Sequence, residues 1–243
     1  MIRRTDLRSR LRRSRAIGAA LLSAAFVAAL VPACNIVAPA SYALFGPGKV
    51  DGQHQLQPVR TVVFIDDRQN VLPRTSLRAS IGEKASQDLL LQKQIPSAVD
   101  PKQAIAVTRQ KEGGAKPMSI AAIGRELECQ QVIYVQLDTF AITGDGEFTT
   151  GNTTSGAGIT PTAKATVKVI DVVNNVRTFP AGDQGGFEIT AKLREVDPDK
   201  LKKVSGRRAV EDQLAIELGQ TIGELFYSHE AVDLGEHLGP RTQ

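Results

Sequence analysis

The sequence predicts an α/β (α+β) domain with a single mixed β-sheet and helices mainly on one side. Residues 61–65 form a continuous β-branched and aromatic run, which is typical of a strand buried on both faces. Residues 186–193 alternate strictly between apolar and polar side chains, which indicates a strand with one face on a core and one in water. Helical spacing of apolar residues recurs between and after the strands. The predicted order is β-α-(β)-α-β-β-β-β-α.

The first half of the domain alternates strands and helices. Apolar residues recur every four positions after Ser76, which predicts a helix of about 17 residues with Ser76 as its N-cap. The repeating positions are Leu77, Ile81, Ala85 and Leu89. Pro96 and Pro101 bracket a turn, and residues 104–108 are interpreted as the short strand in parentheses. Ser119 then caps a second helix that carries apolar residues at 120, 123 and 127.

The second half is predicted to be a meander followed by a packing helix. Residues 131–143, 164–173 and 186–193 read as strands, and Asn174-Asn175 reads as a tight turn before a further strand. Apolar residues at helical spacing over about 20 residues then predict a long amphipathic helix that begins near Ser205-Gly206. They are Val210, Leu214, Leu218, Ile222 and Leu225. Crossovers early in the chain require parallel pairing of the first strands.

The N-terminus has the arrangement of an export signal. Seven arginines precede an apolar run at residues 16–30, which is shorter than the ~20 residues that span a bilayer. The run ends in Val31-Pro32-Ala33-Cys34, which resembles the lipobox of bacterial lipoproteins. The prediction is a signal peptide at residues 1–33 and lipid attachment, with fatty acids such as palmitate, at Cys34. An uncleaved signal anchor and ordinary peptidase cleavage are the alternatives, and Arg12-Arg13 leaves twin-arginine export open.

Removal of the signal changes the composition of the chain. The full sequence has a net charge of +4, but residues 34–243 hold 23 Lys and Arg against 25 Asp and Glu, a net charge of −2. The mature chain has no basic stripe interleaved with aromatic residues, so nucleic-acid binding is not predicted. Pro- and Gly-containing residues 34–58 form a predicted tether, residues 59–228 a single domain, and residues 229–243 a flexible tail.

No motif in the mature chain identifies a reaction, so the protein is predicted not to be an enzyme and to need no cofactor. His54, His229 and His237 lack ligand-spaced partners and are interpreted as solvated, and Cys129 as a buried structural thiol. Asp66 and Asp67 end the first strand and are the weak candidates for a metal site. Neighbours on a strand point to opposite faces, so the simpler interpretation is that these acids solvate a loop.

The most distinctive mature segment is the predicted loop at residues 143–162. Long loops without regular structure inside a domain are often binding elements, and small hydroxyl residues and glycines suit hydrogen bonds to a polar partner. A hairpin tip without function is the alternative. The candidate partner-binding residues are Asp145, Thr149, Asn152, Thr153 and Ser155.

The layout of the chain is similar to that of certain envelope lipoproteins. The shared features are a cysteine at position 34, a tether, an apolar strand at residues 62–65, and a helix end at residues 123–127 followed by an apolar strand at residues 132–135. The lipoproteins are the N-terminal domain of TolB, CsgG-type secretion lipoproteins and uncharacterised planctomycete-type lipoproteins. The resemblance is one of architecture. It implies a lipid-anchored subunit on the periplasmic face of the cell envelope that binds an envelope protein or peptidoglycan. Asn35 is not the aspartate that retains enteric lipoproteins in the inner membrane, which favours the outer membrane.

An accessory lipoprotein of a transporter that binds a small solute or lipid is the second hypothesis for the function, and a hydrolase is a remote third.

Overall fold

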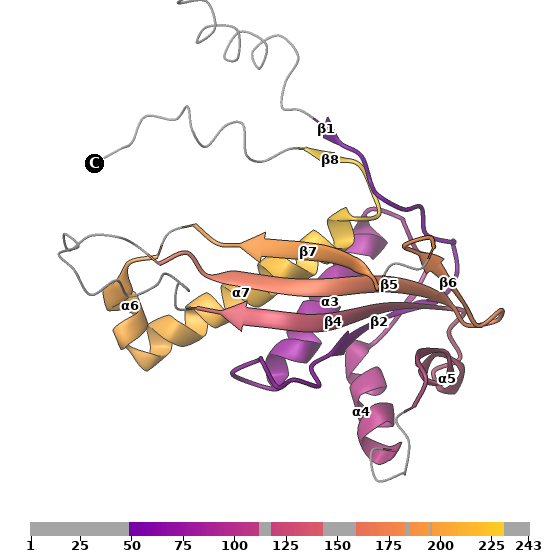
Figure 1. The fold of residues 1–243 in the computed structure, drawn as a ribbon, viewed down its shortest axis with the longest axis horizontal. Helices are drawn as coiled ribbons and strands as arrows, with labels where there is room; N and C mark the ends of the chain where they lie inside the picture. The colour runs from indigo at the N-terminus through magenta and orange to yellow at the C-terminus, as the bar shows by residue number, and fades with distance from the viewer. Residues whose placement is uncertain (1–48, 112–117, 143–158, 183–184, 195, 231–243) are drawn as a thin grey trace, which may run out of the picture. The chain divides into compact units, whose positions relative to one another are not determined.

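The computed structural model describes residues 49–111, 118–142, 159–182, 185–194 and 196–230. A six-stranded mixed sheet lies within a compact unit that runs from Asp51 to His229 (Figure 1). The strands follow the order β3 (Ala98–Val99), β2 (Thr61–Asp66), β4 (Gln131–Ala141) and β5 (Thr162–Asp171), and both β6 (Val176–Phe179) and β7 (Phe187–Lys192) pair with β5. β1 (Lys49–Val50) and β8 (His229–Glu230) pair in a separate two-stranded sheet. The predicted fold class, one mixed sheet with packed helices, is confirmed.

β2 (Thr61–Asp66) is the buried strand that the sequence predicts. It runs parallel to β3 (Ala98–Val99) and to β4 (Gln131–Ala141), and all six of its residues are buried. Val63 and Ile65 belong to a core on one face of the sheet, and Val62 and Phe64 belong to a core on the other face. Burial on both faces explains why no polar residue interrupts residues 62–65.

Two long helices, α3 (Ser76–Leu91) and α7 (Val204–Glu224), pack against each other and cover one face of the sheet (Figure 1). Their apolar positions are buried as predicted. A side chain at Gly219 of α7 would meet α3, because an added Cβ would lie 2.7 Å from the carbonyl oxygen of Ile81. The N-cap of α3 is Thr75 rather than Ser76, and neither its side chain nor a first-turn acid caps the helix. No helix of the described residues is long and apolar enough to cross a membrane.

The segment at residues 104–108, interpreted as a short strand, is helical. It lies inside α4 (Pro101–Lys111), and the optional strand of the predicted order is β3, which ends five residues before position 104. Asp100 starts the helix because its side chain accepts the amide of Lys102 at 2.9 Å, and Pro101 suits a first helical position, where no amide donor is needed. Only Ala104 is fully buried, so the segment presents one stripe rather than two faces.

The other core, under Val62 and Phe64, is covered by α4 and α5 (Ile120–Glu126). Ser119 caps α5 as predicted, since its hydroxyl accepts the amide of Ala122 at 3.2 Å. These two helices are shorter than α3 and α7, and their main strand contacts are with β2, β4 and β5. Helices therefore lie mainly, but not entirely, on one side of the sheet.

The last strands do not form a simple meander. β5 (Thr162–Asp171) is ten residues long, and β6 (Val176–Phe179) pairs with only its last three. β7 (Phe187–Lys192) then pairs with residues 162–167 of β5 instead of with β6. The physical reason is that the long β5 leaves backbone groups unpaired beyond β6, and β7 satisfies them. The predicted turn at Asn174-Asn175 joins β5 to β6.

A short helix that the sequence analysis missed, α6 (Pro198–Lys202), precedes α7. The Asp197 carboxylate caps it by accepting the amide of Asp199 at 2.9 Å. α7 then begins at Val204, before the predicted start at Ser205-Gly206, because the chain has already turned at the extended residue Lys203. Gly206 lies so close to the carbonyl of Lys200 that a Cβ would overlap it.

The end of the predicted tether is part of the packed unit, which begins at Asp51 rather than at residue 59. The backbone amide of Gln53 donates to the carbonyl of Leu225 at 2.7 Å, and Leu56 is buried in the main core. His54 stacks on Phe179 with ring centroids 5.1 Å apart, and its burial lowers its pKa, so it is not the solvated histidine that was predicted. Long-range packing of an otherwise aperiodic segment explains the difference. Residues 231–243 of the predicted tail lie outside the described residues.

Candidate functional site

The surface that stands out in the described residues is the part of the sheet that α4 and α5 do not cover. It carries polar and charged side chains from β4, β5 and β7, and we call it the open sheet face. Its residues are Gln136, Asp138, Lys164, Thr166, Lys168, Glu188, Thr190 and Lys192. The opposite sides of the same strands hold core residues such as Leu137, Ala165 and Ile189. The strict alternation that predicted β7 is therefore what builds this face.

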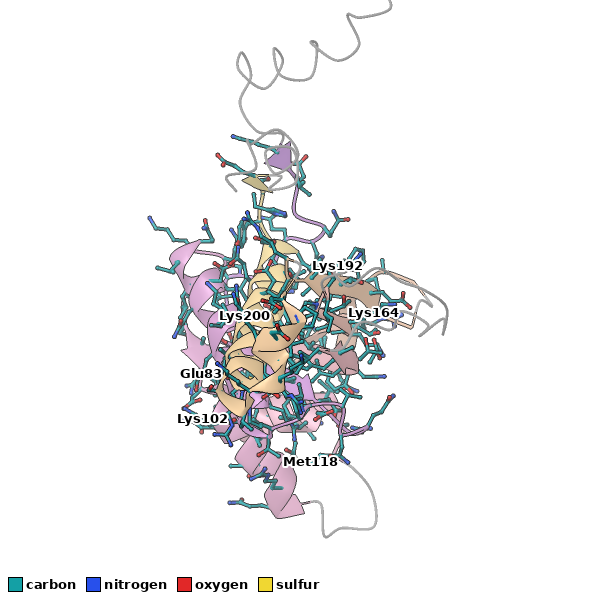
Figure 2. All side chains as sticks on the ribbon, turned by 90° about the vertical axis from the view of Figure 1, so that its left-hand side faces the viewer. Glu83, Lys102, Met118, Lys164, Lys192 and Lys200 are labelled. Atoms are coloured by element: carbon teal, nitrogen blue, oxygen red, sulfur yellow. The ribbon has the colours of Figure 1, made fainter. Side chains whose placement is uncertain are left out.

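The open sheet face carries three lysines against two carboxylates. Lys164 and Lys192 come from neighbouring strands, since Lys164 pairs with Thr190 and Lys192 pairs with Thr162, and Figure 2 labels both. Neither lysine makes an ion pair within the described part of the chain. An array of threonines, amide and free ammonium groups favours contact with a polar partner of net negative charge.

Asp138 lies on the open sheet face, beside a β-bulge in β4. The register of β4 against β5 shifts between Leu137 and Thr139. The Asp138 carboxylate then accepts the hydroxyl of Thr166 at 2.7 Å and the side-chain amide of Gln136 at 3.3 Å. Asp138 shares this side of β4 with Gln136 because alternate residues of a strand point to the same face. The bond joins β4 to β5 across the face and holds the carboxylate in place.

At its end nearest β2, the open sheet face is bounded by a buried carboxylate. The phenol of Tyr134 on β4 donates to the Asp66 carboxylate at 2.5 Å, and Arg68 Nε contacts the same oxygen at 2.8 Å. Lys168 Nζ lies 6.0 Å from the centroid of the Tyr134 ring. Asp66 and Tyr134 are both 5% exposed, so these contacts hold polar groups that would otherwise be buried without partners.

Asp67 does not join Asp66. Its carboxylate accepts the backbone amides of Val71 at 2.8 Å and of Leu72 at 3.4 Å, which shapes the loop between β2 and α3. The two neighbouring acids thus serve different parts of the fold, as alternation along a strand implies. No group of three or more His, Cys, Asp or Glu side chains is placed to hold a metal among the residues that the structure describes.

Burial raises the pKa of the Tyr134 phenol, with the bond to Asp66 as the second cause; burial and Asp88 raise the pKa of Tyr227. Because the folded pKa exceeds the unfolded one, the stability that these phenols contribute is present below about pH 10 and is lost as the pH rises through the folded value. We expect the free energy of unfolding to decrease above about pH 10, and to decrease less in Tyr134→Phe.

Denaturant titrations at several alkaline pH values measure this effect. The phenolate absorbance of the folded protein provides a second measurement, because Tyr134→Phe should leave the titration near pH 10 unchanged if the phenol stays protonated there. A variant whose phenolate signal near pH 10 is smaller than that of the wild type would contradict the expectation.

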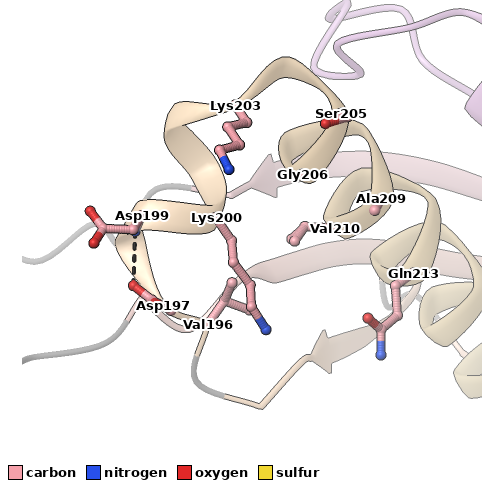
Figure 3. A pocket seen from close by; sticks show the side chains of 10 residues that line it. All are labelled: Val196, Asp197, Asp199, Lys200, Lys203, Ser205, Gly206, Ala209, Val210 and Gln213. Carbon is pink, nitrogen blue, oxygen red and sulfur yellow. Dashed lines mark hydrogen bonds between the residues drawn. The ribbon is translucent and has the colours of Figure 1, made fainter.

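Two grooves lie away from the open sheet face. One, of about 470 Å³, lies between α6 and the start of α7, where Lys200, Lys203 and Asp199 line it (Figure 3). The other, of about 480 Å³, lies between α3 and α4 beside Lys102 and Arg109. Both have charged side chains along their walls. A deep apolar pocket of the kind that lipid binding requires is not among these two grooves.

Cys129 is buried as predicted, and burial raises the pKa of its thiol to about 11. Its Sγ lies 3.4 Å from the carbonyl oxygen of Gly124. His229 contacts the carbonyl of Tyr227 and lies 3.9 Å from Glu224, so it is half-buried rather than solvated. Cys34, His237 and the candidate loop residues Asp145, Thr149, Asn152, Thr153 and Ser155 lie outside the described residues.

Sequence reasoning missed the open sheet face and the Asp66–Tyr134 contact. The two contacting residues are 68 positions apart, and only the parallel pairing of β2 with β4 brings them together. The sequence does contain one indication of the open sheet face, because the polar positions of β7 alternate with its apolar ones. That alternation marks a solvated face but does not show which strands lie beside it.

No protein-family model matches the sequence, and no curated protein matches it. Among solved structures, the chain is similar to the hypothetical protein CT253 from Chlamydia trachomatis, with 12% identity over 68% of this chain and 91% of that one, and a TM-score of 0.38. It is similar to the PelC dodecamer from Paraburkholderia phytofirmans, with 13% identity, 74% and 96% coverage and a TM-score of 0.37. It is also similar to lipoprotein GNA1162 from Neisseria meningitidis, with 12% identity, 64% and 96% coverage and a TM-score of 0.31. The function of this chain is therefore argued from its own residues.

Proposed function

We propose that the protein is a non-enzymatic lipoprotein of the bacterial cell envelope, anchored through Cys34, whose open sheet face binds another envelope component. The resemblance of its layout to TolB-like and CsgG-like lipoproteins belongs to the same proposal, as does placement in the outer membrane. The structural observation that carries the proposal is the open sheet face, a polar surface on a domain whose sequence begins with an export signal and a lipobox.

The contacts of the charged groups support an interaction role over a catalytic one. Asp66 is held by Tyr134 and Arg68, and Asp67 by backbone amides. A nucleophile needs an adjacent base, and groups engaged in this way hold the fold together instead. Lys164 and Lys192 make no ion pair within the described residues, and both are exposed on the open sheet face, where a partner can reach them.

Replacing Cys34 with serine should abolish lipid attachment. We expect the wild-type protein to incorporate labelled palmitate, to begin at residue 34 by intact mass, and to fractionate with membranes. Cys34→Ser should carry no label and leave the membrane fraction, because a hydroxyl cannot replace the sulfur that receives the lipid. Cys129→Ser is the matched control and should remain lipidated, because it keeps Cys34 and removes only a buried thiol.

A palmitate-labelled Cys34→Ser protein, or an unmodified wild-type protein that begins at Met1, would overturn the anchor. Separation of inner and outer membranes on a density gradient tests the outer-membrane placement. Recovery of the wild-type protein with inner-membrane markers would contradict that part alone.

Photo-crosslinking from the open sheet face tests the partner. A photoreactive phenylalanine at Lys164 should capture an envelope protein or peptidoglycan in intact cells, because this position lies within the proposed surface. The same residue at Gln87, which is exposed on α3, is the control and should capture neither. Equal products from the two positions would contradict a role for the face.

A further inference from the structure

The outer edge of β7 has backbone groups that no described strand pairs. β7 pairs with β5 through only one of its two edges. The amide of Leu193 donates to the carbonyl of Pro161, the residue before β5. Because backbone groups alternate between the two edges of a strand, those of residues 191, 189 and 187 also point toward β5. The backbone groups of Glu188, Thr190 and Lys192 therefore point outward. An edge of this kind is a template for another strand.

The three outward residues are complementary to themselves. In an antiparallel pair of two β7 strands centred on Thr190, Thr190 lies opposite Thr190 of the second copy. Glu188 then lies opposite Lys192 of the second copy, and Lys192 opposite Glu188. Such a pair has a two-fold axis, as an isologous contact between identical chains requires. Opposite charges and threonine pairs directly across two strands are stabilising.

Charge also selects this register over its neighbours. Centring the pair on Glu188 would place two carboxylates opposite each other, and centring it on Lys192 would place two ammonium groups opposite each other. Centring it on Ile189 would lose both ion pairs. Only the register centred on Thr190 satisfies both charges on both chains.

The side chains that this register needs are available. Glu188, Thr190 and Lys192 are exposed, and Glu188 and Lys192 make no ion pair within the described residues. The alternating residues Ile189 and Ala191 lie on the opposite face of β7 and are already buried in the core under α7. A second β7 strand would therefore leave the core of each copy unchanged.

We propose that two copies of this chain associate through β7, centred on Thr190, to form one sheet that continues across the two-fold axis. Because the axis is perpendicular to the sheet, the two open sheet faces lie on the same side. The dimer thus doubles the surface that the proposed function assigns to partner binding, although the association itself does not depend on that function. The two-fold axis repeats the contact between Glu188 and Lys192, so the dimer has two such ion pairs.

Variants that reverse the charges at residues 188 and 192 test the register. The mature, full-length protein is kept in detergent, and sedimentation measures the mass of its protein component and so its oligomeric state. The wild type should show a concentration-dependent monomer–dimer equilibrium. Glu188→Lys and Lys192→Glu should each weaken self-association by at least ~10-fold, because each puts like charges opposite each other twice. The double variant should restore the wild-type dissociation constant to within about threefold.

A mixture gives the sharpest outcome. Glu188→Lys and Lys192→Glu, each weak alone, should form a heterodimer when mixed, because both facing pairs then have opposite charges. Lys164→Glu is the matched control, since it makes the same charge change on the same face one strand away from the edge, and it should leave the equilibrium unchanged.

Thr190→Pro tests the backbone pairing separately. Proline removes only an outward amide, which an edge strand tolerates, so the far-ultraviolet circular dichroism should not change while dimerisation is lost. A wild type that is monomeric at every concentration, single variants that dimerise normally, or a mixture that stays monomeric would each overturn the proposal. Loss of dimer in Lys164→Glu equal to that in Lys192→Glu would also overturn it.

Discussion

Replacing Gly219 with valine is expected to destabilise the domain by about 3 kcal/mol, and to lower its melting temperature by about 6 to 12 °C. Helix propensity alone gives the opposite sign, because valine is a better helix former than glycine. The structure reverses it, since an added Cβ at Gly219 lies 2.7 Å from the Ile81 carbonyl oxygen and 2.8 Å from the Lys84 Cβ. The Ile81 atom is backbone and cannot rotate away, so α7 and α3 would have to separate.

Denaturant unfolding measures this change, with Gln213→Val as the control. Gln213 is exposed on the same helix, so valine there should alter the free energy of unfolding by no more than about 0.5 kcal/mol. Gly219→Ala should give a smaller loss than Gly219→Val because its side chain ends at the Cβ. A Gly219→Val protein as stable as the wild type would mean that the two helices do not pack this closely.

Replacing Arg74 with alanine is expected to destabilise the domain by about 3 kcal/mol, at the low end of what removal of one partner from a buried ion pair costs. Arg74 Nε contacts the Glu211 carboxylate at 2.6 Å, and Glu211 is 4% exposed. The guanidinium Nη2 contacts Asp212 at 2.7 Å and donates to the carbonyl of Arg208 at 3.3 Å. Without Arg74, the Glu211 carboxylate remains buried and loses its counterion.

Lys102→Ala is the matched control for Arg74→Ala. Lys102 also contacts a carboxylate, that of Glu83, at 2.6 Å, but the two side chains are 66% and 37% exposed. Exposed pairs contribute about 0 to 1 kcal/mol, so equal distances should give unequal effects. Adding Glu211→Gln to Arg74→Ala should recover part of the loss, because no charge is then buried without a partner. A loss in Arg74→Ala no larger than in Lys102→Ala would contradict the assignment.

The elements that sequence analysis placed well are those whose residues interact locally. β2 follows from a run of β-branched residues, α5 from Ser119 before a periodic segment, and β7 from strict alternation. In each case the side chains that decide the element lie within a few positions of one another. The period of the apolar residues then specifies the element without reference to the rest of the chain.

The features that it misplaced depend on residues outside the misread segment, and most of those residues are distant in the chain. Residues 104–108 contain β-branched side chains that fit a strand, yet Asp100 and Pro101 begin a helix before them. Residues 51–57 have no period, and their position is set by Leu225 and Phe179, far along the chain. Pairing of β7 with β5 rather than with β6 depends on the unequal lengths of β5 and β6.

The sequence by itself determined the class of the fold and the alternation that makes one side of β7 polar, and it is the sole basis for the predicted signal peptide and lipid attachment at Cys34. Those properties reside in composition and in short-range periodicity. Only the tertiary structure decided which strands lie side by side, that Asp66 meets Tyr134, that α7 touches α3 at Gly219, and that one edge of β7 is not paired by any described strand. The reason is physical: sheet neighbours and helix contacts join residues far apart in the chain, and local periodicity carries no information about which distant segment supplies the partner.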